Sequence, residues 1–114
     1  MHKPAMIDRK KIHAFVDEVA RLFHPERILL FGSYACGQPG ADSDVDLLVI
    51  MPHQGHPAIQ AAQIRKRIRA GFPMDLIVRS PREIKKRVAM DDFFITEILE
   101  QGETLYEAAH ARVG

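Results

Sequence analysis

The chain has 114 residues, enough for one domain with a single hydrophobic core, and 46% of its residues are hydrophobic. Its formal net charge is only +1, so general binding to polyanions, including nucleic acid as a direct substrate, is not expected. No apolar run approaches the ~20 residues of a membrane span, and residues 1–6 lack signal-peptide character. The single cysteine, Cys36, cannot form an internal disulfide, which agrees with a cytoplasmic protein.

Charged side chains are segregated along the chain. The stretch 65–87 is rich in basic side chains, whereas the stretch 91–107 is rich in acidic ones. Two solvent-exposed helix faces are the simpler explanation of this pattern. A basic surface that faces an anionic substrate or partner is the alternative.

Hydrophobic spacing and capping residues predict nine elements. Apolar residues recur at helical intervals from Ile12 to Phe23, with Asp8 as N-cap, and Ser80, Pro81 and Glu83 form a capping-box pattern. The expected elements are a helix from about Asp8 to Phe23, a strand over 27–31, one or two helical turns over 33–37, a strand over 45–51, a helix from Pro57 to about Ala70, a strand over 74–79, a helix from Pro81 to Val88, a helix that begins near Asp91 or Asp92 and stops at Gly102, and an edge strand over 104–106. This order predicts an α/β (α+β) fold in which a small mixed sheet carries helices mainly on one face.

Three aspartates are the candidate metal ligands. Asp44 and Asp46 are two residues apart on a strand, so their side chains share one face and their Cα atoms lie roughly 6–7 Å apart. Asp75 opens the following strand and joins the same cluster if the two strands are neighbours. Crowded carboxylates repel one another unless cations neutralise them. Hard oxygen ligands with open positions suit Mg²⁺ or Mn²⁺.

Gly32 and Ser33 form a candidate phosphate-binding turn, because they follow a strand and open a short helix. Glycine allows the backbone to approach a ligand closely, and amides at a helix N-terminus bind phosphate oxygens. A turn that binds an anion beside a two-metal site would position a nucleoside triphosphate for in-line attack on its α-phosphate.

At these residues the chain resembles the minimal nucleotidyltransferases of the DNA polymerase β-like superfamily. Their signature is Gly-Ser, ten residues, Asp-x-Asp and a later aspartate, which here reads Gly32–Ser33, ten residues, Asp44–Val45–Asp46, then Asp75. The resemblance covers about residues 8–107 of what we expect to be one domain over 1–114. It implies that Asp44 and Asp46 hold the metal, that Asp75 helps to deprotonate the acceptor hydroxyl, and that Gly32 and Ser33 contact the triphosphate.

The resemblance also implies a partner. Many relatives form toxin–antitoxin pairs with a small helical HEPN protein, in which the HEPN protein is an RNase toxin. The minimal nucleotidyltransferase is the antitoxin and can transfer AMP from ATP to a tyrosine of the toxin. The short chain has no room for an acceptor-binding domain, so a partner protein, in a possible hetero-oligomer, is expected to supply the acceptor.

Two other functions stay open. Cys36 stands where relatives often carry an arginine, which removes a cation near the expected phosphates. A catalytically weak chain that neutralises its partner by binding alone is therefore one alternative. The other is a transferase that modifies a small hydroxylated molecule, such as an aminoglycoside.

The remaining signals are weaker. His53 and His56 flank a loop, and solvent-exposed loop residues are the simpler interpretation than a zinc site, which needs two further ligands. Phe93, Phe94 and the apolar residues that follow them resemble a core-facing helix stripe, although an exposed part of it could contact a partner.

Overall fold

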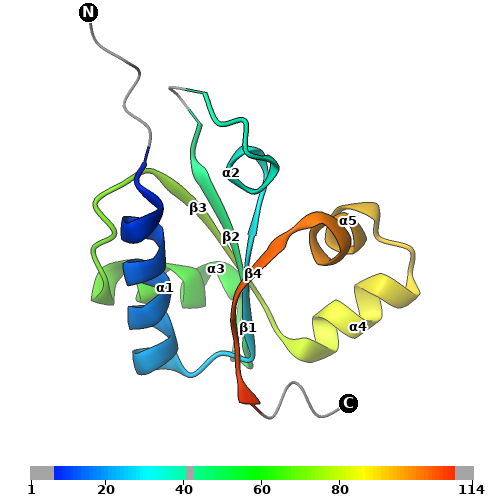
Figure 1. The fold of residues 1–114 in the computed structure, drawn as a ribbon. Helices are drawn as coiled ribbons and strands as arrows, with labels where there is room; N and C mark the ends of the chain where they lie inside the picture. Colours follow the sequence, from blue (N-terminus) through cyan, green and yellow to red (C-terminus); the bar gives the residue numbers. More distant parts are fainter. Residues whose placement is uncertain (1–6, 41–42, 110–114) are drawn as a thin grey trace, which may run out of the picture.

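A computed structural model describes residues 7–40 and 43–109, and its elements follow the predicted order (Figure 1). The elements are α1 (Arg9–Phe23), β1 (Arg27–Phe31), α2 (Ser33–Cys36), β2 (Val45–Ile50), α3 (Pro57–Arg67), β3 (Met74–Arg79), α4 (Pro81–Ala89), α5 (Phe93–Gln101) and β4 (Glu103–Glu107). The helix predicted to reach about Ala70 ends at Arg67 instead. Ile68 takes an extended conformation and its side chain is buried in the core, so the chain leaves the helix before Gly71.

The four strands form one mixed sheet in the order β3-β2-β1-β4. β1 is antiparallel to both of its neighbours, whereas β2 and β3 are parallel. The end of β1 therefore lies beside the start of β2, which in turn lies beside the start of β3. The predicted mixed sheet is confirmed, and this edge of it carries the candidate site.

Both faces of the sheet are covered by helices. The larger core packs α1 and α3 against alternate strand residues such as Ile28, Leu47 and Val49. A smaller apolar cluster on the other face contains Leu29, Leu48 and residues of α4 and α5, and Figure 1 shows the two pairs of helices on opposite sides. The sequence predicted helices mainly on one face. α1 and α3 cover the face with the larger core, but α4 and α5 cover the other face as well.

Local capping explains where several helices begin. The Asp8 side chain accepts a hydrogen bond from the Lys10 backbone N–H at the start of α1. At α4, the Ser80 hydroxyl accepts from the Glu83 backbone N–H, and the Glu83 carboxylate accepts from the Ser80 backbone N–H, which is the predicted capping box. Asp92 rather than Asp91 caps α5, through the Ile95 backbone N–H. Each cap satisfies a donor that the first helical turn leaves without a partner.

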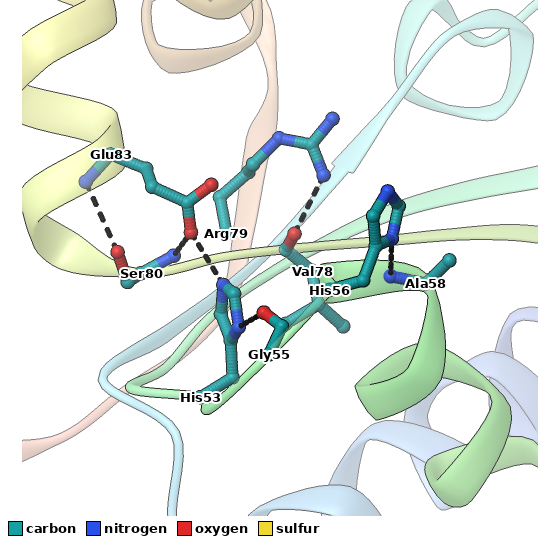
Figure 2. Close-up of polar contacts among 8 residues, drawn as sticks. All are labelled: His53, Gly55, His56, Ala58, Val78, Arg79, Ser80 and Glu83. Atoms are coloured by element: carbon teal, nitrogen blue, oxygen red, sulfur yellow. Dashed lines mark hydrogen bonds and ion pairs between the residues drawn. The ribbon is translucent and has the colours of Figure 1, made fainter.

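A polar network ties the loop after β2 to the start of α4 (Figure 2). His53 contacts the Glu83 carboxylate through Nε2 at 2.5 Å and the Gly55 carbonyl through Nδ1 at 3.2 Å. Its side chain is only 7% exposed, so the expectation of a solvent-exposed loop histidine was wrong. His56 does lie at the surface, where its Nδ1 accepts from the Ala58 backbone N–H and caps α3.

The Glu83 carboxyl of this network is more acidic than usual. Burial raises its pKa, but hydrogen bonds from the Ser80 backbone and the His53 side chain outweigh burial and lower the pKa below its ordinary value. The ionised form is therefore favoured by folding.

The turn from α4 into α5 carries exposed apolar side chains. Phe93 is 79% exposed and Met90 is 68% exposed, although the sequence suggested that Phe93 and Phe94 belong to a core stripe. The buried residues of α5 are Ile95 and Ile98. Within residues 7–40 and 43–109, no helix is long and apolar enough to cross a membrane.

Candidate active site

Strand register brings the predicted residues to one edge of the sheet. Asp46 is the register partner of Phe31 on β1 and of Asp75 on β3. Asp44 directly precedes β2, and Gly32 directly follows β1. Two carboxylates separated by 28 residues of intervening sequence thus become direct neighbours across a parallel strand pair.

Gly32 is fitted against the Asp46 carboxylate. Its backbone has φ 71° and ψ −151°, a conformation that is essentially restricted to glycine. A Cβ atom at this position would lie 2.2 Å from Oδ2 of Asp46. Glycine is therefore required twice, once by the backbone and once by the space that the carboxylate occupies.

The turn after Gly32 is a single short helix, α2. The Gly32 carbonyl accepts hydrogen bonds from the backbone N–H groups of Ala35 and Cys36, and Gly37 ends the turn in a left-handed conformation. Ser33 starts the helix, so its N–H has no acceptor within the helix. Gly32, at the start of this turn, lies directly against the Asp46 carboxylate, and Ser33 follows it.

The aspartates interact electrostatically. Burial raises the pKa of Asp46 above its ordinary value, and the nearby carboxylates of Asp75 and then Asp44 raise it further. Both other aspartates are exposed, whereas Asp46 is half-buried between them and the turn. The three side chains form one coupled cluster in which like charges repel.

The donor set fits a hard divalent cation. Carboxylate oxygens are the ligands that Mg²⁺ and Mn²⁺ prefer, and a cation would relieve the repulsion that raises the pKa of Asp46. Among the described residues, no three His, Cys, Asp or Glu side chains are already drawn together as a finished metal site. The three aspartates are therefore candidate ligands at one edge of the sheet, and they do not form an assembled metal site among the described residues.

A cleft of about 310 Å³ opens beside Asp46, between α2 and α5. The sequence did not predict it. Its walls include Phe31 at the end of β1 and the α5 residues Phe94, Glu97, Ile98 and Gln101. These four α5 residues recur at intervals of three and four, so the helical spacing of one face is the signal that could have found them.

A sequence profile of the nucleotidyltransferase domain family matches residues 12–104, which include the whole cluster and the turn. The chain belongs to this family. It is a nucleotidyltransferase, and membership implies a nucleoside triphosphate substrate and a divalent metal ion.

Individual relatives agree with the assignment. A protein of Methanocaldococcus jannaschii named as a candidate protein adenylyltransferase is 28% identical over 103 residues, which are 89% of this chain and all of that protein. The crystal structure of a candidate nucleotidyltransferase from Sulfolobus solfataricus is 28% identical, with a TM-score of 0.55 over 68% of this chain and 70% of that one.

A toxin–antitoxin complex shares the fold. A chain of the MntA-HpeT complex, crystallised as a variant with two aspartate-to-glutamate substitutions, matches with a TM-score of 0.57. The match covers 91% of this chain and 77% of that one at 16% identity. The nucleotidyltransferase fold predicted from the sequence is confirmed.

Proposed function

We propose that this chain transfers AMP from ATP to a hydroxyl group of a partner protein, with Mg²⁺ as cofactor, and that it acts as the antitoxin of a HEPN-type toxin in the cytoplasm. The observation that carries the proposal is the direct pairing of Asp46 with Asp75, beside Gly32 and the α2 turn. The acceptor we expect is a tyrosine of the partner.

The roles that we propose for the residues are those that the family resemblance implies, and the grouping of these residues at one sheet edge supports them. Asp44 and Asp46 would hold the cation, which supplies charge neutralisation and a fixed position for the phosphates when bound. Asp75, exposed at the start of β3, would accept the proton of the incoming hydroxyl. The hydroxyl oxygen bonds to the α-phosphorus, and the bond to the bridging oxygen breaks so that pyrophosphate leaves with the electron pair. Ser33 and the amides at the start of α2 would contact the phosphates that leave.

Two comparisons support a protein as the acceptor. The Methanocaldococcus jannaschii relative carries the name of a protein adenylyltransferase, and the MntA-HpeT complex is a toxin–antitoxin pair. The exposed Phe93 and Met90 at the turn between α4 and α5 provide an apolar surface of the kind that protein partners cover.

The proposal is tested by incubating the purified chain with ATP, Mg²⁺ and the protein encoded beside it. We expect the intact mass of that protein to rise by one AMP group with the wild-type chain, and not with Asp44→Ala. Asp17→Ala is the matched control, because Asp17 is an exposed aspartate of α1 outside the cluster. No transfer by the wild-type chain, or equal transfer by Asp44→Ala and Asp17→Ala, would overturn the proposal.

Neutralisation by binding alone is the second candidate, and the exposed apolar turn at Phe93 is the observation that favours it. The two functions separate in cells that express the toxin. If Asp46→Ala protects these cells as fully as the wild-type chain does, binding is sufficient. If Asp46→Ala binds the toxin and does not protect, AMP transfer is the neutralising step.

A further inference from the structure

The outward surface of α4 and α5 lies uncovered by the rest of the described chain. No residue of α4 is buried, and Phe93 and Met90 are the most exposed large apolar side chains among the described residues. Exposed residues recur along both helices at intervals of three and four, so each helix carries one outward stripe. The two stripes form what we call the α4–α5 face, which comprises Arg82, Lys86, Met90, Phe93, Glu97 and Glu100.

The α4–α5 face is basic on one helix and acidic on the other. Arg82 and Lys86 supply the cations of α4, and Glu97 and Glu100 supply the carboxylates of α5. In the part of the chain that the structure describes, none of these four side chains forms an ion pair. The neighbouring Arg87, in contrast, pairs with the N-cap carboxylate of α5 at 2.8 Å. The face therefore offers unpaired charges of both signs to a partner.

The spacing of the charges on α4 matches the spacing on α5. The two cations lie about 6 Å and 12 Å back along α4 from Met90, at the rise of an α-helix. The two carboxylates lie about 6 Å and 10 Å forward along α5 from Phe93. If the α5 helix of one molecule lay antiparallel to the α4 helix of another, with Phe93 against Met90, each carboxylate would face a cation.

A groove at the end of α4 offers a place for the Phe93 ring. It has a volume of about 410 Å³ and is lined by Glu83, Lys86, Arg87, Met90 and Asp92. A ring in this groove would bury apolar surface against Met90 and would lie close to the cations of Lys86 and Arg87, which attract the face of an aromatic ring. Phe93 of the same molecule is not among the lining residues, so the ring would come from a second molecule.

We propose that the α4–α5 face is the interface of a homodimer, in which Phe93 of each copy enters the groove beside Met90 of the other copy. The carboxylates of each α5 then pair with the cations of the opposite α4. A two-fold contact uses the same patch on both copies, so the patch must be complementary to itself, and a face with matched charges of both signs meets this condition. A partner of a single charge would match only half of it.

The dimer is expected to be weak and sensitive to salt. Exposed ion pairs contribute little each and are screened by added salt. We therefore expect a dissociation constant on the order of 10–100 μM at low ionic strength, as for small interfaces. Sedimentation velocity of the full chain, without ATP, metal or partner, should show dimer forming over this range and dissociating as salt is added.

Two charge-reversed variants test the pairing of the helices. One carries Glu97→Lys with Glu100→Lys, so that its face is wholly basic, and the other carries Arg82→Glu with Lys86→Glu, so that its face is wholly acidic. Each variant alone should be monomeric, because like charges would then meet across the interface. An equimolar mixture should dimerise at least as tightly as the wild-type chain, and this recovery also shows that both variants are folded.

Matched controls lie on the other side of the sheet. Lys11→Glu with Asp17→Lys reverses exposed charges of α1, and this variant should dimerise as the wild-type chain does (Figure 1). Phe93→Ala should weaken the dimer by about tenfold or more, as expected for a central aromatic contact. Ile59→Ala removes an exposed apolar side chain of α3 and should leave the dimer unchanged. Because Glu97 also lines the cleft beside Asp46, association rather than activity is the readout.

Three results would overturn the homodimer. They are a wild-type chain that stays monomeric well above the expected dissociation constant, a mixture of the charge-reversed variants that does not dimerise, and equal effects of Phe93→Ala and Ile59→Ala. If the wild-type chain is monomeric and Phe93→Ala instead loses binding to the protein encoded beside it, the face belongs to that protein. Loss of the homodimer leaves the proposed AMP transfer standing, and absence of AMP transfer leaves the homodimer standing.

Discussion

Replacing Gly32 with alanine tests how closely the turn and the carboxylate cluster depend on each other. The added Cβ would lie 2.2 Å from Oδ2 of Asp46, whereas ordinary contacts begin near 3.4 Å, so the carboxylate must withdraw by about 1.2 Å. A misplacement of about 1 Å in a catalytic arrangement costs on the order of a hundredfold in rate. The strained backbone, with φ 71° and ψ −151°, costs a further ~1–3 kcal/mol of folding stability.

Gly37→Ala is the control for strain without a clash. Gly37 also has a positive φ, of 76°, and no atom lies within 4 Å of the position that its Cβ would take. We expect both variants to unfold at a lower temperature, by roughly 4–12 °C for Gly32→Ala and less for Gly37→Ala. Only Gly32→Ala should lose AMP transfer, by about a hundredfold at a temperature where both are folded. Similar transfer rates for the two variants would refute the reasoning.

Three further predictions concern charge and capping. Because burial and the carboxylates of Asp75 and Asp44 raise the pKa of Asp46, its ionised form opposes folding, so Asp46→Asn should raise the melting temperature in EDTA. Mg²⁺ should then raise the melting temperature of the wild-type chain and leave that of Asp46→Asn nearly unchanged, as differential scanning fluorimetry would reveal. Ser80→Ala removes the 3.1 Å hydrogen bond to the Glu83 N–H and should cost about 1 kcal/mol in urea unfolding at pH 7. The pKa of Glu83 is lowered in the folded state, so its contribution is present above its ordinary value of 4.5 and is lost as the pH falls through the lowered value. The difference in unfolding free energy between the wild-type chain and Glu83→Gln should therefore shrink on acidification below pH 4.5, and a constant difference would contradict the network in Figure 2.

Local signals predicted the order of elements and the alignment of the aspartates. Asp8 and Ser80 cap the helices they were expected to cap, because capping depends on residues close in sequence. The approach of Asp75 to Asp46 followed from placing both at the starts of successive strands, and the parallel register makes them direct partners. These features required no knowledge of distant contacts beyond the adjacency of two strands.

The features that were missed depend on tertiary contacts. Phe93 and Phe94 begin a short apolar run in which spacing does not decide which side chains are buried, and packing against the sheet selects Ile95 and Ile98. The His53 side chain is largely covered and pairs with Glu83, 30 residues later, which no local pattern indicates. The covering of the second face of the sheet, in contrast, could have been predicted from the sequence. Consecutive apolar residues such as Leu29 and Leu30 indicate a strand that is covered on both faces.

The most direct test of the proposed function follows the two ends of ATP separately. The wild-type chain and its partner protein are incubated with Mg²⁺ and ATP labelled at either the α-phosphate or the γ-phosphate, and the label on the partner is counted. AMP transfer at the cluster of Asp44, Asp46 and Asp75 predicts α-label on the partner, no γ-label, and loss of the α-label with Asp75→Asn. Transfer of the γ-label, or undiminished α-label with Asp75→Asn, would contradict the account.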